Sequence, residues 1–104
     1  MAAPRRSLLW SPEAEADLAH IWNYYADVAG PDVARLMVRA IGESCVMLEA
    51  HSLAGRARDE IRPGLRSLLA APHVIFYRVS DNEVQIVRVL DGRRDIDEIF
   101  AEAP

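Results

Sequence analysis

The chain has 104 residues, about half of them apolar, which is enough for one domain with a hydrophobic core and too few for two. Its formal net charge of −4 argues against the strongly basic class of nucleic-acid-binding proteins. All twelve basic residues are arginine, so any mechanism that needs a lysine is excluded. We therefore predict a single domain over residues 1–104.

Cysteine usage and hydropathy indicate a compartment. Cys45 is the only cysteine, and it lies in a helical apolar pattern typical of a small core residue. One cysteine cannot form an intrachain disulfide, which fits a reducing cytoplasm. The start of the chain has no apolar stretch of signal-peptide length, and no run approaches the roughly 20 apolar residues of a transmembrane helix. These features predict a soluble cytoplasmic protein that does not bind a membrane.

Residues 7–10 form a short apolar run that predicts a strand, without placing it in a sheet. A helix start follows, because Ser11 can cap free N–H groups, Pro12 suits the first helical position and Glu13 complements the positive helix end. Gly30 and Pro31 end this helix. Its predicted core face consists of Ala14, Leu18, Ile21, Trp22, Tyr25, Val28 and Ala29, and its predicted polar face of Glu13, Asp17, His20, Tyr24 and Asp27.

A second helix is predicted from about Asp32 to Glu49 or Ala50, and the short break before it makes the two helices an antiparallel hairpin. Its core face is predicted to be Ala34, Met37, Val38, Ile41, Cys45 and Leu48. A second apolar stripe runs beside that face and consists of Val33, Leu36, Ala40 and Met47. This stripe either faces the sheet or receives another protein.

The second half of the chain predicts a small sheet. Residues 51–63 are charged, contain Gly55 and Pro63, and are predicted to be a loop. Apolar runs predict antiparallel strands at about 65–71, 73–79 and 84–90, and Asp95 can cap a short last helix whose apolar side is Ile96, Ile99 and Phe100. The predicted fold class is α+β, with element order β-α-α-β-β-β and a short C-terminal helix. The helical hairpin packs on a small, mainly antiparallel sheet.

No motif predicts a metal or a cofactor. The histidines are far apart, and the glycines form neither a Walker nor a dinucleotide pattern. The remaining candidate is a polar cluster on or near the predicted sheet, made of Arg62, Arg66, His73, Tyr77, Arg78, Arg93 and Arg94. Cleavage of RNA by its 2′-hydroxyl needs a base, an acid and cations for the phosphorane. His73 or Glu60 suits the base, Tyr77 the acid and Arg66 the clamp; alternatively, these residues only pack or form ion pairs.

These residues resemble the RelE/ParE toxin superfamily of bacterial toxin–antitoxin modules, and its ParE branch most closely. The segments that carry the resemblance are Leu9–Ala14 with Asp17–Leu18 and Ile21–Tyr24, Gly55–Arg56, Gly64–Ser67, His73–Val79 and Ile86–Asp95. Their order and spacing cover nearly the whole chain. The fold of the superfamily, a helical hairpin on a small sheet, agrees with the elements predicted above.

The resemblance implies a toxin that an antitoxin neutralises. ParE-like members are associated with poisoning DNA gyrase by binding it, whereas RelE-like members are ribosome-dependent mRNA endonucleases that use lysines, arginines and a late tyrosine or histidine. This chain has no lysine, and Asp91–Asp95 after its last strand contains neither a histidine nor a tyrosine. That departure favours gyrase inhibition, with no catalytic residue, over the endonuclease reading. The ParE pattern often has a histidine where Asp91 stands, and an inactive interaction module remains a third reading.

The resemblance also implies how partners bind. A ParD-like antitoxin would contact DNA itself and fold its flexible half on the toxin, so that DNA meets the toxin only through the antitoxin. The stripe Val33, Leu36, Ala40 and Met47 can receive an amphipathic helix, and Arg78 and Arg88 can pair with its acids. Arg62, Arg66, Arg93 and Arg94 are the candidate contacts to the target. Alternatively, Arg94 pairs with Asp91, Asp95 or Asp97.

Overall fold

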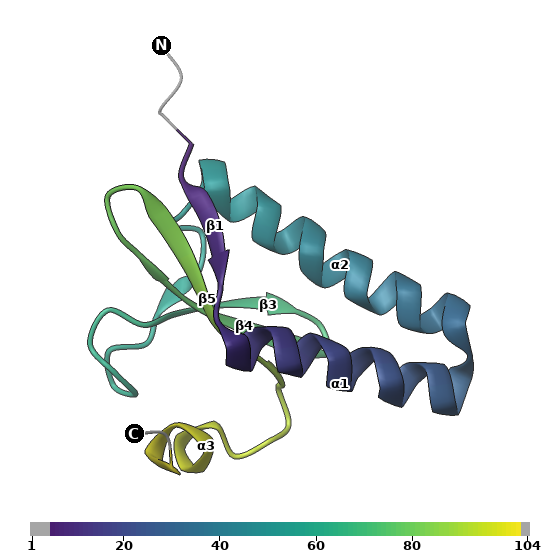
Figure 1. Cartoon of the computed structure of the whole chain (residues 1–104). Helices are drawn as coiled ribbons and strands as arrows, with labels where there is room; N and C mark the ends of the chain where they lie inside the picture. The colour runs from purple at the N-terminus through teal and green to yellow at the C-terminus, as the bar shows by residue number, and fades with distance from the viewer. Residues whose placement is uncertain (1–4, 103–104) are drawn as a thin grey trace.

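The computed structural model describes residues 5–102, whose two helices and sheet form two main layers, with a third helix on the far side of the sheet (Figure 1). The strands are β1 (Ser7–Trp10), β2 (Arg56–Ala57), β3 (Arg66–Ala70), β4 (His73–Val79) and β5 (Glu83–Asp91). The helices are α1 (Pro12–Ala29), α2 (Pro31–Ala50) and α3 (Ile96–Glu102). None of the helices within residues 5–102 has the length and apolar character needed to cross a membrane.

The five strands form one sheet in the order β1-β5-β4-β3-β2. The pairs β2–β3, β3–β4 and β4–β5 are antiparallel, while β1 lies parallel to β5, with Ser7 opposite Glu83 and Trp10 opposite Ile86. The predicted α+β fold with a mainly antiparallel sheet is therefore confirmed. One part of the prediction was wrong, because the segment 51–63 is not only a loop but contains the two-residue strand β2.

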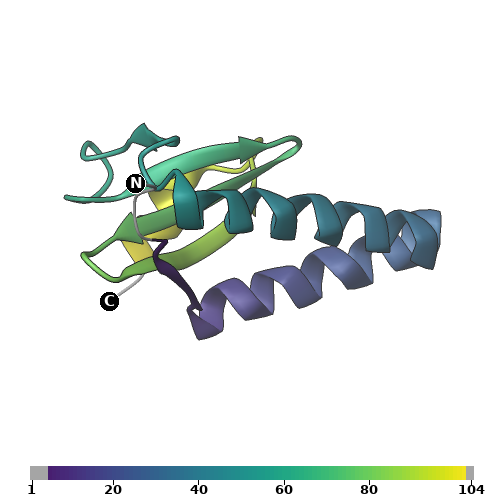
Figure 2. The ribbon, with the colours of Figure 1, turned by 90° about the horizontal axis from the view of Figure 1, so that it is seen from above.

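Helix α1 begins as its sequence predicts. The Ser11 hydroxyl oxygen accepts a hydrogen bond from the Ala14 N–H (3.0 Å) and donates one to the Val87 carbonyl (2.8 Å), so it both caps the helix and fixes it to β5. Gly30 reverses the chain between the two helices with φ +94°, a left-handed conformation in which a side chain would be strained. The next helix then starts at Pro31, and the two helices pack as the predicted hairpin (Figure 2).

The main core lies between this hairpin and the sheet. Its fully buried members come from both layers: Ala14, Ile41, Cys45, Leu48, Ile75, Tyr77, Val84, Ile86 and Val89. Cys45 is a core residue, as predicted, and burial raises the pKa of its thiol to about 12. A thiol with that pKa is protonated at neutral pH and is therefore a poor nucleophile.

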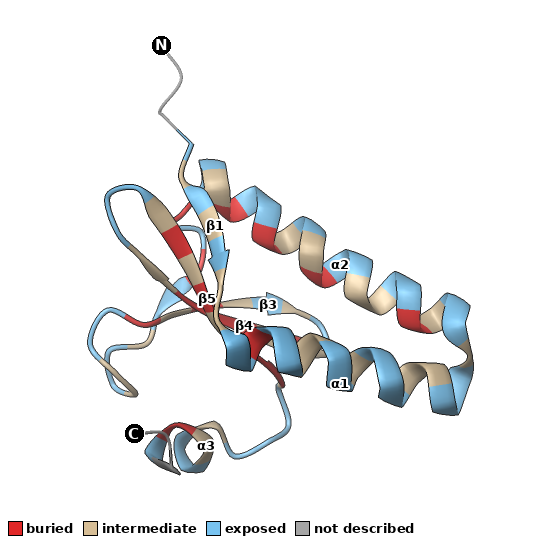
Figure 3. Ribbon diagram, viewed as in Figure 1, coloured by how far each residue is buried: buried red, intermediate tan, exposed pale blue. Residues whose placement is uncertain are grey.

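The predicted core face of α1 is wrong at the far end of the helix. Ala14 is buried, but Trp22 is 36% exposed and Val28 is 59% exposed. The reason is visible in Figures 2 and 3: the hairpin is longer than the sheet and projects beyond it, so its distal turns have no sheet beneath them. Helical periodicity identifies the face of a helix but not where its covering layer ends.

The other face of the sheet has a smaller core of Leu65, Phe76, Leu90 and Phe100. Phe100 comes from α3, and its ring meets that of Phe76 edge-to-face at 5.0 Å. Asp95 caps α3, as predicted, because its carboxylate accepts a hydrogen bond from the Glu98 N–H (3.1 Å). Alternate residues of β4 thus point into different cores, which explains why both of its faces are mostly apolar.

Candidate functional site

The Tyr77 side chain lies inside the main core. Its hydroxyl donates a hydrogen bond to the Ser52 carbonyl (2.8 Å) and accepts one from the Gly55 N–H (2.8 Å), so it secures the loop that follows α2. Gly55 is needed at this close approach, because a Cβ there would lie 2.5 Å from the tyrosine oxygen. The side chain is 0% exposed. A buried hydroxyl with both backbone partners in place is a structural anchor rather than an acid that substrate can reach.

The other residues of the hypothetical nuclease set meet different surroundings. Glu60 is exposed and pairs with Arg58 (2.7 Å), and the hydrogen bond from that guanidinium lowers the pKa of the Glu60 carboxyl. Arg66 donates from Nη2 to the Gly55 carbonyl (2.8 Å) and the Leu53 carbonyl (3.3 Å). His73 lies at the start of β4, on the side of α1. The structure does not assemble His73, Tyr77 and Glu60 into one reactive group.

Arg62 supports the smaller core. Its Nη2 donates to the Phe100 carbonyl (2.6 Å), and its guanidinium lies over the Phe100 ring, 5.2 Å from the centroid. These contacts join the 51–63 segment to α3. Arg62, a candidate contact to the target, therefore also has a structural role, because it fixes the C-terminal helix against the sheet.

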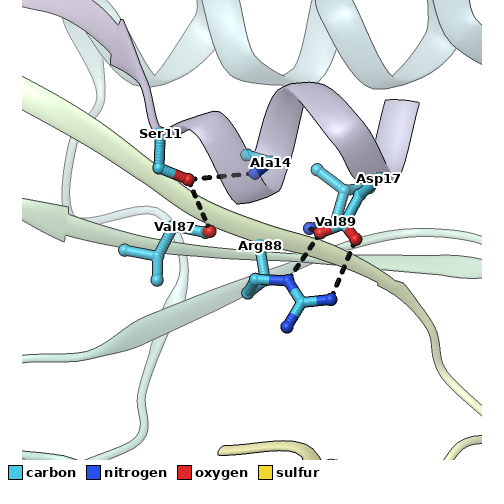
Figure 4. Close-up of polar contacts among 6 residues, drawn as sticks. All are labelled: Ser11, Ala14, Asp17, Val87, Arg88 and Val89. Atoms are coloured by element: carbon cyan, nitrogen blue, oxygen red, sulfur yellow. Dashed lines mark hydrogen bonds and ion pairs between the residues drawn. The ribbon is translucent and has the colours of Figure 1, made fainter. Parts of the chain in front are cut away.

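Arg88 is held inside the fold by Asp17 of α1 (Figure 4). Its Nε and Nη2 donate to the two carboxylate oxygens at 2.8 and 2.9 Å, and Asp17 also accepts the Val89 N–H (2.9 Å). The hydrogen bond to Asp17 raises the pKa of Arg88. Asp17 thus fixes α1 to the part of β5 that β1 does not cover. Arg78, the other proposed partner of antitoxin acids, is half-buried on β4 opposite Gln85.

The loop after β5 holds both remaining candidate arginines. Arg93 pairs with Asp91, with Nη2 at 2.7 Å and Nε at 3.0 Å from the carboxylate, and this hydrogen bonding lowers the pKa of Asp91 well below its usual range. The Arg94 side chain is exposed and has no ion pair within residues 5–102, while its N–H donates to the Asp91 carbonyl (3.1 Å). The acid Asp91 is therefore taken by Arg93, not by Arg94.

A cavity of about 350 Å³ lies where α1 leaves the sheet, and we call it the corner pocket. It is lined by Asp17, His20, Ile21, Tyr24, Tyr25, His73, Val89, Leu90, Asp91, Arg93 and Arg94. Tyr25 stands between two other rings, with centroids 5.0 Å from Tyr24 and 6.0 Å from His73, both edge-to-face. His73 is 4% exposed, and burial lowers its pKa, with Asp91 acting in the opposite direction and Arg93 in the same one.

Sequence reasoning missed this pocket. The polar face predicted for α1 includes His20 and Tyr24, which periodicity places toward solvent. In the structure they line the pocket together with the end of β5. Two histidines and two adjacent tyrosines were a compositional signal, but they come from α1 and β4, and the sequence does not reveal that these elements meet there. Nowhere within residues 5–102 do three His, Cys, Asp or Glu side chains gather in a way that could hold a metal ion.

The second stripe of α2 faces solvent rather than the sheet. Leu36 is 63% exposed, Met47 is 37% exposed and Ala40 is also exposed, while Val33 is half-buried. Figure 3 shows that much of the surface of α2 is exposed along its length. The alternative in which the stripe faces the sheet is therefore wrong for Leu36, Ala40 and Met47, and binding of another protein there stays a prediction.

Comparisons with known proteins agree with one another. The family described as "ParE toxin of type II toxin-antitoxin system, parDE" matches residues 8–96. Toxin ParE1 of Mycobacterium tuberculosis is 42% identical over 90 residues, covering 86% of this chain and 92% of that protein. Toxin ParE3 of Caulobacter vibrioides is 32% identical over 80 residues, covering 77% of this chain and 80% of that protein.

Solved structures share the fold. A chain of the chromosomal ParDE toxin–antitoxin system from P. aeruginosa superposes with a TM-score of 0.75 at 32% identity, covering 86% of this chain and 98% of that one. The YoeB dimer from Staphylococcus aureus, at 22% identity and a TM-score of 0.58, shares the fold alone. The match over residues 8–96 takes in both long helices and all five strands except Ser7. This chain therefore belongs to the ParE toxin family of type II toxin–antitoxin systems.

Proposed function

We propose that this toxin acts in the cytoplasm by binding DNA gyrase and blocking replication, and that a ParD-like antitoxin neutralises it by direct contact. The observation that carries the choice of an inhibitor over a nuclease is the burial of Tyr77 with both hydroxyl partners satisfied. Arg66 and Glu60 are likewise engaged within the fold, and the chain contains no lysine. A nuclease would need an accessible acid and base beside free cations.

The antitoxin part of the proposal rests on the exposed stripe of α2. Leu36, Ala40 and Met47 lie on one side of a 20-residue helix, which suits an amphipathic helix laid along it. The Arg35–Asp32 and Arg39–Glu43 pairs provide polar neighbours on the same helix. An antitoxin segment that folds on this stripe buries apolar surface that the isolated toxin leaves in water. DNA is contacted through the antitoxin, since the toxin has a net charge of −4.

The test is a supercoiling and cleavage assay with purified gyrase and antitoxin-free toxin, run beside an in vitro translation reaction that is probed for mRNA cuts. Trapped gyrase–DNA breaks with intact mRNA are the expected result. Cut mRNA with unaffected gyrase would replace the proposal with a RelE-type endonuclease. A chain that affects neither reaction and does not arrest growth would be an interaction module without toxin activity.

A further inference from the structure

The corner pocket collects side chains from three segments that lie far apart in the sequence. Its walls come from the middle of α1, from the first residue of β4 and from the end of β5 with the loop beyond it. It is lined by α1 on one side and by the end of β5 on the other, so a partner can be held on two sides. Concave sites of a few hundred Å³ at such junctions are typical binding sites.

The surface of the pocket is apolar and aromatic inside and cationic at one point of its rim. Half-buried Ile21 supplies aliphatic surface, and Tyr24, which is 58% exposed, supplies an open aromatic wall, whereas Val89 and Leu90 are each only 2% exposed. The two acids of the lining are already neutralised, since Asp17 holds Arg88 and Asp91 holds Arg93. Arg94 is the guanidinium of the lining that has no ion pair within residues 5–102.

We propose that the corner pocket is the docking site for the target protein, and that it takes one large apolar or aromatic side chain together with an adjacent carboxylate. The side chain would lie against Tyr24 and Ile21, and the carboxylate would receive Arg94 as a charge-assisted pair. This inference rests on the proposed function in one respect, namely that the toxin acts by binding a protein. The inference adds where the target protein binds and which side chains of the target bind there.

Charge favours a peptide anchor over a nucleic acid strand. A strand carries a phosphate at each nucleotide and is held by several cations that follow its backbone. Here one unpaired arginine lies beside Asp95 and Glu98, which line the neighbouring hollow with it. A single carboxylate next to an apolar side chain matches one cation beside an apolar pocket, whereas a row of phosphates would meet these acids.

The pocket is also separate from the proposed antitoxin stripe. The stripe belongs to α2, and its exposed members are Leu36, Ala40 and Met47, none of which lines the pocket. Substitutions in the two places should therefore have opposite consequences. Pocket variants should lose toxicity and keep antitoxin binding, because the proposed antitoxin surface is on α2.

The first test uses Tyr24→Ser and Arg94→Ala, two exposed positions, with Arg56→Ala on β2 as the matched arginine control. Growth arrest on expression without antitoxin is measured beside antitoxin affinity by calorimetry and the urea midpoint. We expect both pocket variants to need at least about tenfold more protein for arrest, because truncating an anchor contact is costly. Their antitoxin affinity and midpoints should equal those of the wild type, and Arg56→Ala should behave as the wild type throughout.

Full growth arrest by Tyr24→Ser and Arg94→Ala would overturn the proposal, as would a parallel loss of antitoxin affinity, which would make the pocket part of the antitoxin site. A wild-type chain that causes no arrest would overturn it together with the proposed function. If the wild type arrests growth but leaves gyrase unaffected, gyrase fails as the target while the pocket is still judged by its variants.

The second test probes the anchor chemistry by NMR of the full chain. N-acetyl-Trp-Glu-amide is titrated against the wild type, with N-acetyl-Trp-Lys-amide and thymidine monophosphate as the comparison ligands. The acidic dipeptide should shift the ring signals of Tyr25 and His73 in the wild type and leave them in place in Arg94→Ala. Equal shifts by the lysine dipeptide would remove the role of the carboxylate, and larger shifts by the nucleotide would make the site a nucleotide pocket instead.

Discussion

The Tyr77 hydroxyl gives the sharpest test at the scale of single residues. It is fully buried and is the partner of both the Gly55 N–H and the Ser52 carbonyl. Tyr77→Phe removes the hydroxyl and leaves those two backbone groups without it, so the free energy of unfolding should fall by about 1–3 kcal/mol. Urea denaturation followed by circular dichroism measures this. Toxicity per folded molecule should not change, since the hydroxyl does not reach solvent.

Tyr24→Phe is the matched control, because the Tyr24 side chain is 58% exposed and its ring remains in the variant. Its unfolding free energy should lie within about 0.5 kcal/mol of the wild type, as for most surface changes. If Tyr77→Phe were as stable as the wild type but no longer toxic, the hydroxyl would have a chemical role, and the view of Tyr77 as an anchor would be wrong.

His73 predicts a pH dependence of stability. Burial lowers its pKa in the folded protein, so between the folded and unfolded pKa values the unfolded chain binds more protons. The contribution of neutral His73 is complete above the unfolded value of about 6.5, and stability falls as pH drops below it toward the folded pKa. The groups facing it include the Tyr25 ring of α1, Asp91 at the end of β5 and Arg93 in the loop that follows.

The measurement is the urea midpoint of wild type, His73→Gln and His20→Gln at several pH values between about 7 and 5. His73→Gln should have the flatter profile, while His20→Gln, at an exposed position, should follow the wild type. Carboxylates with lowered pKa values, such as Asp91 and Glu60, lose their contribution only at more acidic pH, so they do not confuse this window. If the urea midpoint changed with pH equally in His73→Gln and the wild type, the pH dependence could not be assigned to His73.

The candidate residues show what sequence can predict at this scale. Residue type and position were enough to foresee the caps Ser11 and Asp95, because a cap depends on neighbours in the chain. They were not enough to predict which of Arg93 and Arg94 pairs with Asp91, since that depends on the shape of the loop after β5. Nor did they reveal that Arg88 pairs with Asp17, because that contact joins positions 71 residues apart.

At the scale of elements, α2 carries the prediction about the antitoxin. Leu36 is 63% exposed in the middle of the proposed stripe, so Leu36→Glu places a charge where an apolar contact is expected without disturbing the core. Antitoxin binding should weaken by at least about tenfold, since a buried, unpaired charge at an interface is costly. Calorimetry measures the affinity, and circular dichroism checks that the helix content is unchanged.

Leu69→Glu on β3 is the control, because Leu69 is 69% exposed and lies outside the stripe. It should keep normal antitoxin affinity. A Leu36→Glu chain that binds as tightly as the wild type would show that the antitoxin uses another surface. Loss of affinity in both variants would point to a site that includes the β3 edge.

The sequence predicted best those elements whose patterns extend over many residues. Both long helices have caps, breaks and an apolar period, and their ends lie within about two residues of the predicted ones. Strand β2 was missed because two exposed residues carry no pattern. The partner of β1 could not be foreseen either, since four residues fix no register and its parallel pairing depends on the path of the whole hairpin.

At the scale of the molecule, the two cores share the strands that separate them. On β4, Ile75 and Tyr77 point into the main core, whereas Phe76 points into the smaller one beneath α3. Both tryptophans, Trp10 on β1 and Trp22 on α1, lie outside the smaller core, so tryptophan fluorescence reports on the hairpin side of the protein. This arrangement allows cooperativity between the layers to be measured.

Phe100→Ala tests that cooperativity. The ring is 5% exposed, packs against Phe76 and lies under the Arg62 guanidinium, so its removal should cost about 3–5 kcal/mol if the chain unfolds as one unit. The urea midpoint seen by tryptophan fluorescence should then fall as far as the midpoint seen by circular dichroism, although neither tryptophan touches the altered site. Leu69→Ala, at an exposed position, should leave both midpoints in place. An unchanged fluorescence midpoint, with an early loss of helical signal in Phe100→Ala, would mean that α3 detaches alone and that the shared strands do not couple the two layers.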